Sequence, residues 1–174
     1  MTDKNGNATN PIAYMLIGVP GSGKSTWLTQ RLPANIAIVS TDYYIEKIAN
    51  ALGKTYGSIF QDTIGVATKW MSEQINTVTK ACIDLAWDQT NLSMKSRRHK
   101  LNLLRDAGYD VVAVAFEIPT AELERRRKER EVATGKVIAA SVLEEMGKTY
   151  TRPTRLEGFH KVIIVSPDGE REGD

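Results

Sequence analysis

The chain has 174 residues, of which 41% are apolar and 25% are charged, as is typical of one globular domain. Its 23 lysines and arginines against 21 aspartates and glutamates leave a formal charge of +2, which excludes a general polyanion-binding surface and confines basic regions to local patches. The single cysteine, Cys82, excludes an internal disulfide and is typical of a reducing cytoplasm, and we expect it to be buried on a helix.

The two ends of the sequence are polar. The start lacks the hydrophobic region of a signal peptide, and no apolar stretch has the length needed to cross a bilayer. The sequence therefore predicts a cytoplasmic protein without a membrane partner. We divide it into a disordered lead-in (1–11), one domain (12–167) and a polar tail (168–174).

Apolar runs alternate with helical patterns along the chain. The apolar runs predict strands at residues 13–19, 36–40, 82–87, 111–118 and 161–165. Of these, the run at 82–87 could also end the helix before it. Apolar spacing and capping signals predict helices at 24–32, from Tyr43, at 64–82, 93–108 and 120–131, and from Ser141, where S-V-L-E fits a capping box. This order predicts an α/β fold in which helices flank a parallel sheet and ligands bind where its strands end.

The first strand leads into the sequence GVPGSGKST, which fits the pattern G-x-x-x-x-G-K-[ST]. Glycines let successive backbone N–H groups point at phosphate oxygens, and the next helix presents the positive end of its dipole. We expect Lys24 to reach the β- and γ-phosphates and Ser25 to help hold Mg²⁺. The predicted nucleotide-binding residues are Gly18, Gly21, Ser22, Gly23, Lys24, Ser25 and Thr26.

Polar residues follow the second and third strands. Asp42 could act as a general base for an acceptor hydroxyl or could cap the next helix. In the segment D-Q-T-N, Asp88 could contact an acceptor hydroxyl, reach Mg²⁺ through water or hold arginines, whereas Thr90 and Asn91 could bond a substrate or cap a helix.

Arginines dominate the predicted helix at 120–131. Arg126 and Arg130 are four residues apart and so share one face, which suits a lid that closes over ATP and stabilises charge on a transferring phosphoryl group. The alternative is a solvated helix whose glutamates pair with the arginines.

Taken in order, these features resemble the kinase domain of polynucleotide 5′-hydroxyl kinases, both the phage enzymes and the kinase half of the eukaryotic repair enzymes. The matching features are GVPGSGKST, T-D after the second strand, D-x-T-N followed by Arg97 and Arg98, an arginine helix and the ending MGKTYTRPTRLEGFHKVIIV. The resemblance implies a P-loop kinase fold with an arginine-bearing lid, which uses ATP and Mg²⁺ and transfers a phosphoryl group to a nucleic-acid hydroxyl.

By position, the resemblance makes Asp42 the general base and Arg130 the lid arginine with Arg126 beside it, and puts Asp88 in the acceptor pocket. Two features depart from the family. Where the phage enzymes carry a basic residue for the acceptor's phosphate, this chain has Ile45 with only Lys47 nearby. Segment 53–63 has no counterpart, and the D-x-D-x-T signature of the fused phosphatase domain is absent.

Several acceptors are open at this point. The family default is a strand-end 5′-hydroxyl, and related phage enzymes act on hydroxymethyl groups of modified bases such as 5-hydroxymethyluracil. Candidates for stacking on a base are the aromatic residues Tyr43, Tyr44, Tyr56 and Trp87. The alternatives are a small-molecule or amino-sugar phosphotransferase and a nucleotide-binding regulatory module.

Overall fold

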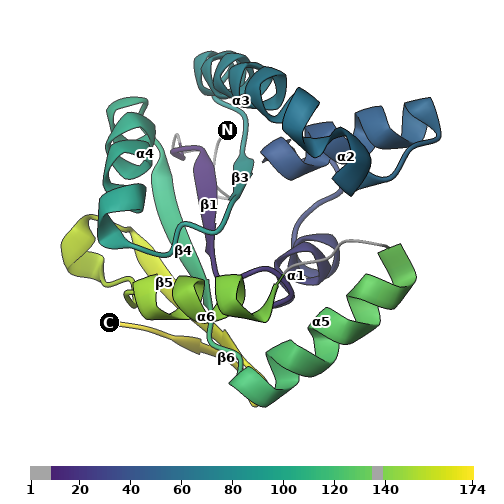
Figure 1. Ribbon diagram of the computed structural model, residues 1–174. Coiled ribbons are helices and arrows are strands. Elements are labelled where there is room, and N and C mark those ends of the chain that lie inside the picture. Colours follow the sequence, from purple (N-terminus) through teal and green to yellow (C-terminus); the bar gives the residue numbers. More distant parts are fainter. Residues whose placement is uncertain (1–8, 135–138) are drawn as a thin grey trace.

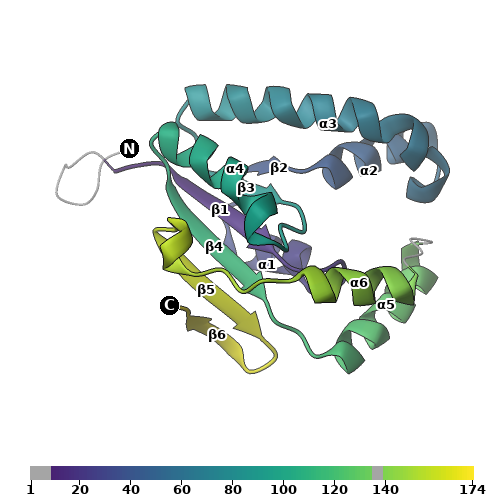
Figure 2. The ribbon, with the colours of Figure 1, turned by 60° about the vertical axis from the view of Figure 1, so that its left-hand side comes forward.

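The computed structural model describes residues 9–134 and 139–174, and gives only the backbone of residues 130–134. Most of the expected lead-in, residues 1–8, lies outside the described residues. Figure 1 and Figure 2 show a twisted sheet with helices on its two faces.

The sheet confirms the predicted α/β fold. In the described residues its order is β2-β3-β1-β4-β5-β6, and every pair is parallel except β5 with β6. The strands are β1 (Ile12–Ile17), β2 (Ala37–Val39), β3 (Leu85–Asp88), β4 (Asp110–Phe116), β5 (Lys161–Ser166) and β6 (Gly169–Glu172). The carboxyl ends of β1, β2 and β3 therefore meet at one edge, where the glycine loop, Asp42 and D-Q-T-N follow them.

The helices are α1 (Lys24–Arg31), α2 (Thr41–Leu52), α3 (Tyr56–Lys80), α4 (Met94–Asp106), α5 (Thr120–Thr134) and α6 (Ala140–Thr149), with a short 3₁₀ helix η1 (Arg155–Glu157). Alternating strand residues divide the core between the two faces of the sheet. On β1, Met15 packs on the face covered by α3 and α4, whereas Leu16 packs against Trp27 and Leu28 of α1.

Helix α2 and the first half of α3 form a hairpin that extends beyond the sheet (Figure 2). The hairpin has a small core of its own, built from Ile45, Ala49, Ile59 and Ala67. The unassigned segment 53–63 supplies its turn and the first residues of α3, because Gly53 ends α2 with a φ of 62° and α3 begins at Tyr56. Helix α3 is therefore longer than the predicted 64–82.

The expected polar tail is wrong in part, because residues 169–172 form β6. All of the β6 residues are exposed, so the strand is held by backbone pairing with β5 and by polar contacts of Glu170, and not by apolar burial. A turn signal, Pro167-Asp168-Gly169, precedes the strand and could have predicted the hairpin, and Gly169 has a φ of 118°.

Two local predictions are also wrong. Cys82 is exposed and lies beyond the end of α3 with a φ of 51°, where the chain reverses toward β3. The expected capping box at Ser141 does not form, because α6 begins one residue earlier, with Ala139 as its N-cap.

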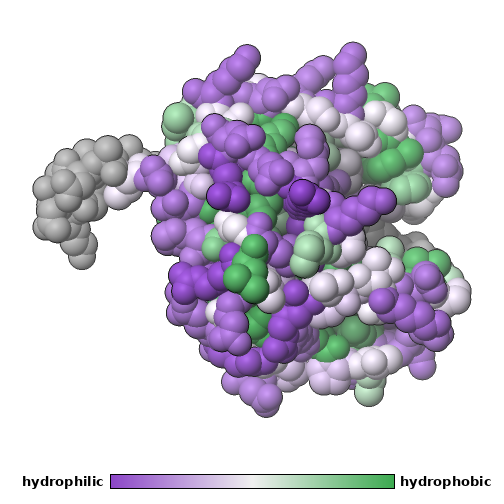
Figure 3. Space-filling model, turned by 90° about the vertical axis from the view of Figure 1, so that its left-hand side faces the viewer, coloured by the Kyte–Doolittle hydropathy of each residue, from purple (hydrophilic) through white to green (hydrophobic). Residues whose placement is uncertain are grey.

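The face around α4 and β5 is mainly hydrophilic, and apolar residues appear on it as separate small patches (Figure 3). Among the described helices, none combines the length and the apolar character that a membrane span requires.

Candidate active site

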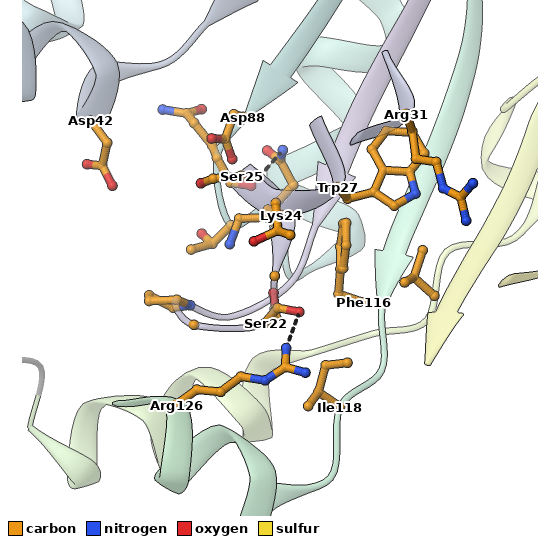
Figure 4. Close-up of a pocket in the computed structure, with 18 of the residues that line it drawn as sticks. Ser22, Lys24, Ser25, Trp27, Arg31, Asp42, Asp88, Phe116, Ile118 and Arg126 are labelled. Atoms are coloured by element: carbon orange, nitrogen blue, oxygen red, sulfur yellow. Dashed lines mark hydrogen bonds between the residues drawn. The ribbon is translucent and has the colours of Figure 1, made fainter. Parts of the chain in front are cut away.

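One cavity of about 1140 Å³ lies at the carboxyl edge of the parallel strands, and α2 and α5 contribute to opposite walls of it (Figure 4). Its centre is the glycine loop and the start of α1, here called the P-loop (residues 18–25). We call one wall the α2 side, formed by Thr41, Asp42, Glu46, residues 88–91, Ser96 and Lys100. We call a second wall the α1 side, formed by Trp27, Gln30, Arg31, Phe116, Ile118 and residues 165–167, 169 and 170. Helix α5 adds a third wall, formed by Arg125, Arg126 and Glu129.

The P-loop backbone has the form of an anion cradle. Gly21 and Gly23 have φ values of 83° and 101°, which favour glycine. Gly23 is also the N-cap of α1 and offers no side chain, so first-turn N–H groups of α1 remain available to a ligand. Lys24 Nζ donates to the carbonyl oxygens of Gly18 and Val19 at 2.9 and 3.0 Å, which folds the lysine over the loop.

Close packing fixes the first glycine of the loop. A Cβ on Gly18 would lie 2.7 Å from Ser22 Oγ and 3.0 Å from Phe116 Cβ, so a larger residue does not fit there. Ser22 is 2% exposed, and its Oγ has no hydrogen-bond partner among the described residues. Ser25 and Thr26, in contrast, are exposed and line the cavity. A nucleotide with Mg²⁺ fits this cradle, and the Ser25 hydroxyl is the P-loop group that would hold the metal.

Asp42 lies on α2 and is directed into the cavity across from the P-loop (Figure 4). It does not cap α2, because the N-cap is Ser40, whose side chain accepts from the Tyr43 N–H at 3.3 Å. Its Oδ1 accepts a hydrogen bond from the Tyr56 hydroxyl at 2.6 Å. The Asp42 carboxylate is therefore held by the hairpin partner helix α3.

The loop after β3 is attached to the P-loop. The Gly18 N–H donates to the carbonyl oxygen of Thr90 at 2.9 Å, and Asn91 Nδ2 donates to the carbonyl oxygen of Leu16 at 2.7 Å. Asn91 is buried, with a φ of 47°. Its predicted capping role is wrong, since Ser93 caps α4 in a capping box with Ser96. Asp88 and Thr90 line the cavity from this loop.

Arg97 is one of the residues that carry the resemblance to polynucleotide 5′-hydroxyl kinases. It is fully buried and faces the protein interior. Its guanidinium pairs with Glu157 of η1 at 2.6 Å and donates to the carbonyl oxygens of Asn91, Leu92 and Thr151. Arg97 therefore connects the loop after β3 to the C-terminal part of the chain.

Helix α5 brings an arginine to the P-loop. Arg126 Nη1 lies 3.4 Å from the carbonyl oxygen of Ser22, which it approaches as a donor (Figure 4), and its Nε donates to Glu122 at 2.7 Å. Hydrogen bonds from Arg125 and Arg126 lower the pKa of Glu122 to about 2. The arginine–glutamate pairs expected of a solvated helix are present on α5. Arg126 also lines the cavity, and the closing lid stays a prediction. The side chain of Arg130 lies outside the described residues.

The α1 side contains residues that the sequence did not single out. Trp27 packs edge-on against Phe116, with ring centroids 6.3 Å apart, and its Nε1 donates to Glu170 of β6 at 3.0 Å. Arg31 pairs with the same carboxylate at 2.9 Å. Strand β6 thus closes this side of the cavity. The sequence did not predict the hairpin of β5 and β6, so it did not predict the α1 side either.

Sequence patterns do not assign two further residues to the site. Lys100 lines the α2 side, and Tyr56 contacts Asp42 from outside the cavity lining. The sequence suggests Tyr56 only for stacking on a base. Neither belongs to a recognisable motif, and both make contacts between different elements, over 14 and 9 residues of the chain. The spacing of the sequence alone carries no signal for such contacts.

Comparisons with known proteins agree with this architecture. The family model AAA_33, described as an AAA domain, matches residues 14–153. The chain is similar in fold to AvrRxo1-ORF1:-ORF2 with ATP, with a TM-score of 0.70 and 11% identity over 95% of this chain and 58% of that one. It is also similar to APS kinase CysC of Mycobacterium tuberculosis in complex with AMPPNP and APS, with a TM-score of 0.54 and 19% identity over 92% and 91% of the two chains.

A third similar structure is the Pnkp1/Rnl/Hen1 complex, with a TM-score of 0.54 and 26% identity. The match covers 71% of this chain and 41% of that one, so this chain spans less than half of that relative. The family match extends over most of the sequence and includes the P-loop, Asp42 and the loop after β3. This chain therefore belongs to the AAA domain family, and its fold is similar to that of a kinase of known structure.

Proposed function

We propose that this protein is an ATP-dependent kinase that transfers the γ-phosphoryl group to a hydroxyl of a nucleic acid. The observation that carries the proposal is the position of Asp42, which faces the P-loop across one continuous cavity (Figure 4). A carboxylate in that position can orient an alcohol and accept its proton. A P-loop hydrolase transfers the phosphoryl group to water, so it needs no binding site for an alcohol opposite the P-loop.

In the proposed reaction the acceptor hydroxyl donates a hydrogen bond to Asp42. Its oxygen then forms a bond to the γ-phosphorus while the bond from that phosphorus to the β,γ-bridging oxygen breaks, ADP leaves, and the hydroxyl proton passes to Asp42. Lys24 and Arg126 supply positive charge around the transferring group. Mg²⁺, held through the Ser25 hydroxyl, would supply further charge compensation on the β- and γ-phosphates.

A nucleic-acid acceptor is supported by the ordered resemblance to polynucleotide 5′-hydroxyl kinases and by the 26% identity to a chain of the Pnkp1/Rnl/Hen1 complex. The aromatic candidate left for stacking on a base is Tyr43, which follows Asp42 in the chain and is 48% exposed, outside the residues that line the cavity. The other aromatic candidates are engaged: Trp87 is buried, Tyr44 packs against Trp70, and Tyr56 holds Asp42. A strand-end 5′-hydroxyl and a hydroxymethyl group on a base both meet these requirements.

A small polar acceptor such as an amino sugar is the second candidate. It is favoured by the three carboxylates on the α2 side, from Asp42, Glu46 and Asp88, which suit a cationic or polyhydroxylated ligand. The structural likeness to a sugar kinase from Janibacter sp. HTCC2649, with a TM-score of 0.56 and 17% identity over 90% and 85% of the two chains, adds a precedent for the fold.

The test is transfer of labelled γ-phosphate from ATP to separate acceptor sets. These are 5′-hydroxyl DNA, 5′-hydroxyl RNA, duplex DNA with 5-hydroxymethyluracil, a panel of sugars and amino sugars, and water alone. We expect label in at least one nucleic-acid acceptor at a rate well above hydrolysis. Label confined to sugars would replace the leading proposal with the second, and release of phosphate to water alone would eliminate both.

A further inference from the structure

Lys100 of α4 is a half-buried cation in the wall of the cavity, on the α2 side. Its Nζ donates to Gln89 Oε1 at 2.6 Å and to Asn91 Oδ1 at 2.5 Å. The same Nζ lies 5.5 Å from the ring centroid of Trp87, within the range of a cation–π contact. The ammonium is thus held in one place, beside the loop that also carries Asp88.

These contacts hold the ammonium without neutralising it. Both hydrogen-bond acceptors are neutral amide oxygens, and an ammonium group has three donors. Burial lowers the pKa of Lys100 to about 8, so the side chain is still mostly protonated at neutral pH. An anionic ligand stabilises a partly desolvated positive charge of this kind.

The surroundings restrict where such an anion can bind. Asp42, Glu46 and Asp88 repel negative charge elsewhere on the α2 side. Among the described residues that form this side, Lys100 is the one lysine or arginine. Lys47, the basic residue nearest to Asp42 in the sequence, is exposed and does not line the cavity. An acceptor with one anionic group is therefore fixed in orientation, with that group at Lys100.

We propose that Lys100 binds a phosphate group of the acceptor, and that the acceptor is therefore a phosphate-bearing alcohol, such as a nucleotide unit, and not a free nucleoside or sugar. The proposal rests on the proposed function, since it takes the α2 side as the acceptor site. It assigns the acceptor-phosphate contact to α4, whereas the resemblance had pointed to residues shortly after Asp42.

The test compares two ligands that differ by one phosphate. Thymidine 3′-monophosphate and thymidine are titrated calorimetrically into the protein in the presence of AMPPNP and Mg²⁺. The Lys100→Met variant is expected to bind the monophosphate about 10- to 100-fold more weakly, because it loses one charge-assisted hydrogen bond. Its binding of thymidine should be nearly unchanged. Lys100→Arg is expected to retain most of the affinity. Lys47→Met is the matched control and is expected to change neither affinity.

Equal weakening of both ligands by Lys100→Met would overturn the proposal, because it would reduce Lys100 to a support for Gln89 and Asn91. Equal binding of both ligands by the wild-type protein would overturn it as well. Lys100→Gln keeps a donor toward Asn91 and replaces the methionine variant if that variant does not fold. Lys100-dependent binding without phosphate transfer to any nucleic-acid acceptor would refute the proposed nucleic-acid acceptor, and Lys100 would remain the residue that binds the phosphate of another phosphate-bearing alcohol.

Discussion

The two sides of the cavity are built in different ways. The α1 side stands on the sheet, since Trp27 and Phe116 belong to the core layer between α1 and the central strands. The α2 side depends on a hairpin that extends beyond the sheet and has a separate small core. The main core of the domain thus supports the α1 side, whereas the small separate core of the hairpin supports Asp42.

The loop after β3 joins the α2 side to the rest of the domain. It is bonded to Gly18 of the P-loop and to Leu16 of β1, and Arg97 links it to the C-terminal part of the chain. Lys100 and Asp88 therefore have firm positions relative to the P-loop, while Asp42 depends on contacts within the hairpin. We infer that the hairpin is the part of the site most able to shift between states, because fewer buried residues hold it.

The largest effect is expected from the buried ion pair behind the loop. Glu157→Gln leaves the fully buried Arg97 without its charge partner and should lower the free energy of unfolding by about 3–5 kcal/mol. Urea denaturation measures the loss. The control is Glu144→Gln, which removes an exposed pair with Lys148 and should leave the unfolding midpoint unchanged. Equal midpoints for the two variants would mean that the loop is not anchored through Arg97.

Asp42→Asn comes next. It should lower turnover by roughly 10²–10⁴ with little change in the KM for ATP, because the carboxylate acts on the acceptor and not on the nucleotide. Asp62→Asn, on the exposed surface of α3, is the matched control. Unchanged turnover in the Asp42 variant would remove the proposed base and with it the functional meaning of the α2 side.

Arg126→Gln examines the wall that α5 forms. Loss of a guanidinium beside the P-loop should lower kcat/KM for ATP by about 10- to 100-fold and leave the KM of the acceptor unaffected. Arg127→Gln, on the same helix but outside the cavity wall, should have little effect. A change in acceptor KM without a change in the ATP parameters would contradict the assignment of Arg126 to the nucleotide.

The smallest effect is expected from Tyr56→Phe, which removes the hydroxyl that holds Asp42 and should reduce turnover by about 3- to 10-fold. The deciding measurement is a double-mutant cycle. In an Asp42→Asn background the same change should cost nothing further, since Tyr56 acts through that carboxylate. Tyr43→Phe is the control. Additive losses would show that Tyr56 supports the hairpin generally and not the base.

Sequence reasoning performed best where the information was local. The P-loop, most strands and the alternation of strands and helices along the chain were predicted because each depends on residues a few positions apart. The sequence did not predict β6, which depends on turn chemistry. It also gave no prediction for segment 53–63, whose structure depends on packing within the helical hairpin. The predicted roles of Asp42, Asp88 and Arg130 stay predictions until they are measured.

By itself, the sequence determined an α/β domain with a phosphate cradle at the end of its first strand, because hydrophobic periodicity and glycine conformations are properties of short segments. Only the tertiary structure decided that Tyr56 holds Asp42, that Arg97 faces the interior and that Lys100 borders the cavity. The physical reason is that these contacts join residues on different elements. Their formation depends on how helices pack against the sheet and against each other, and no spacing along the chain encodes that.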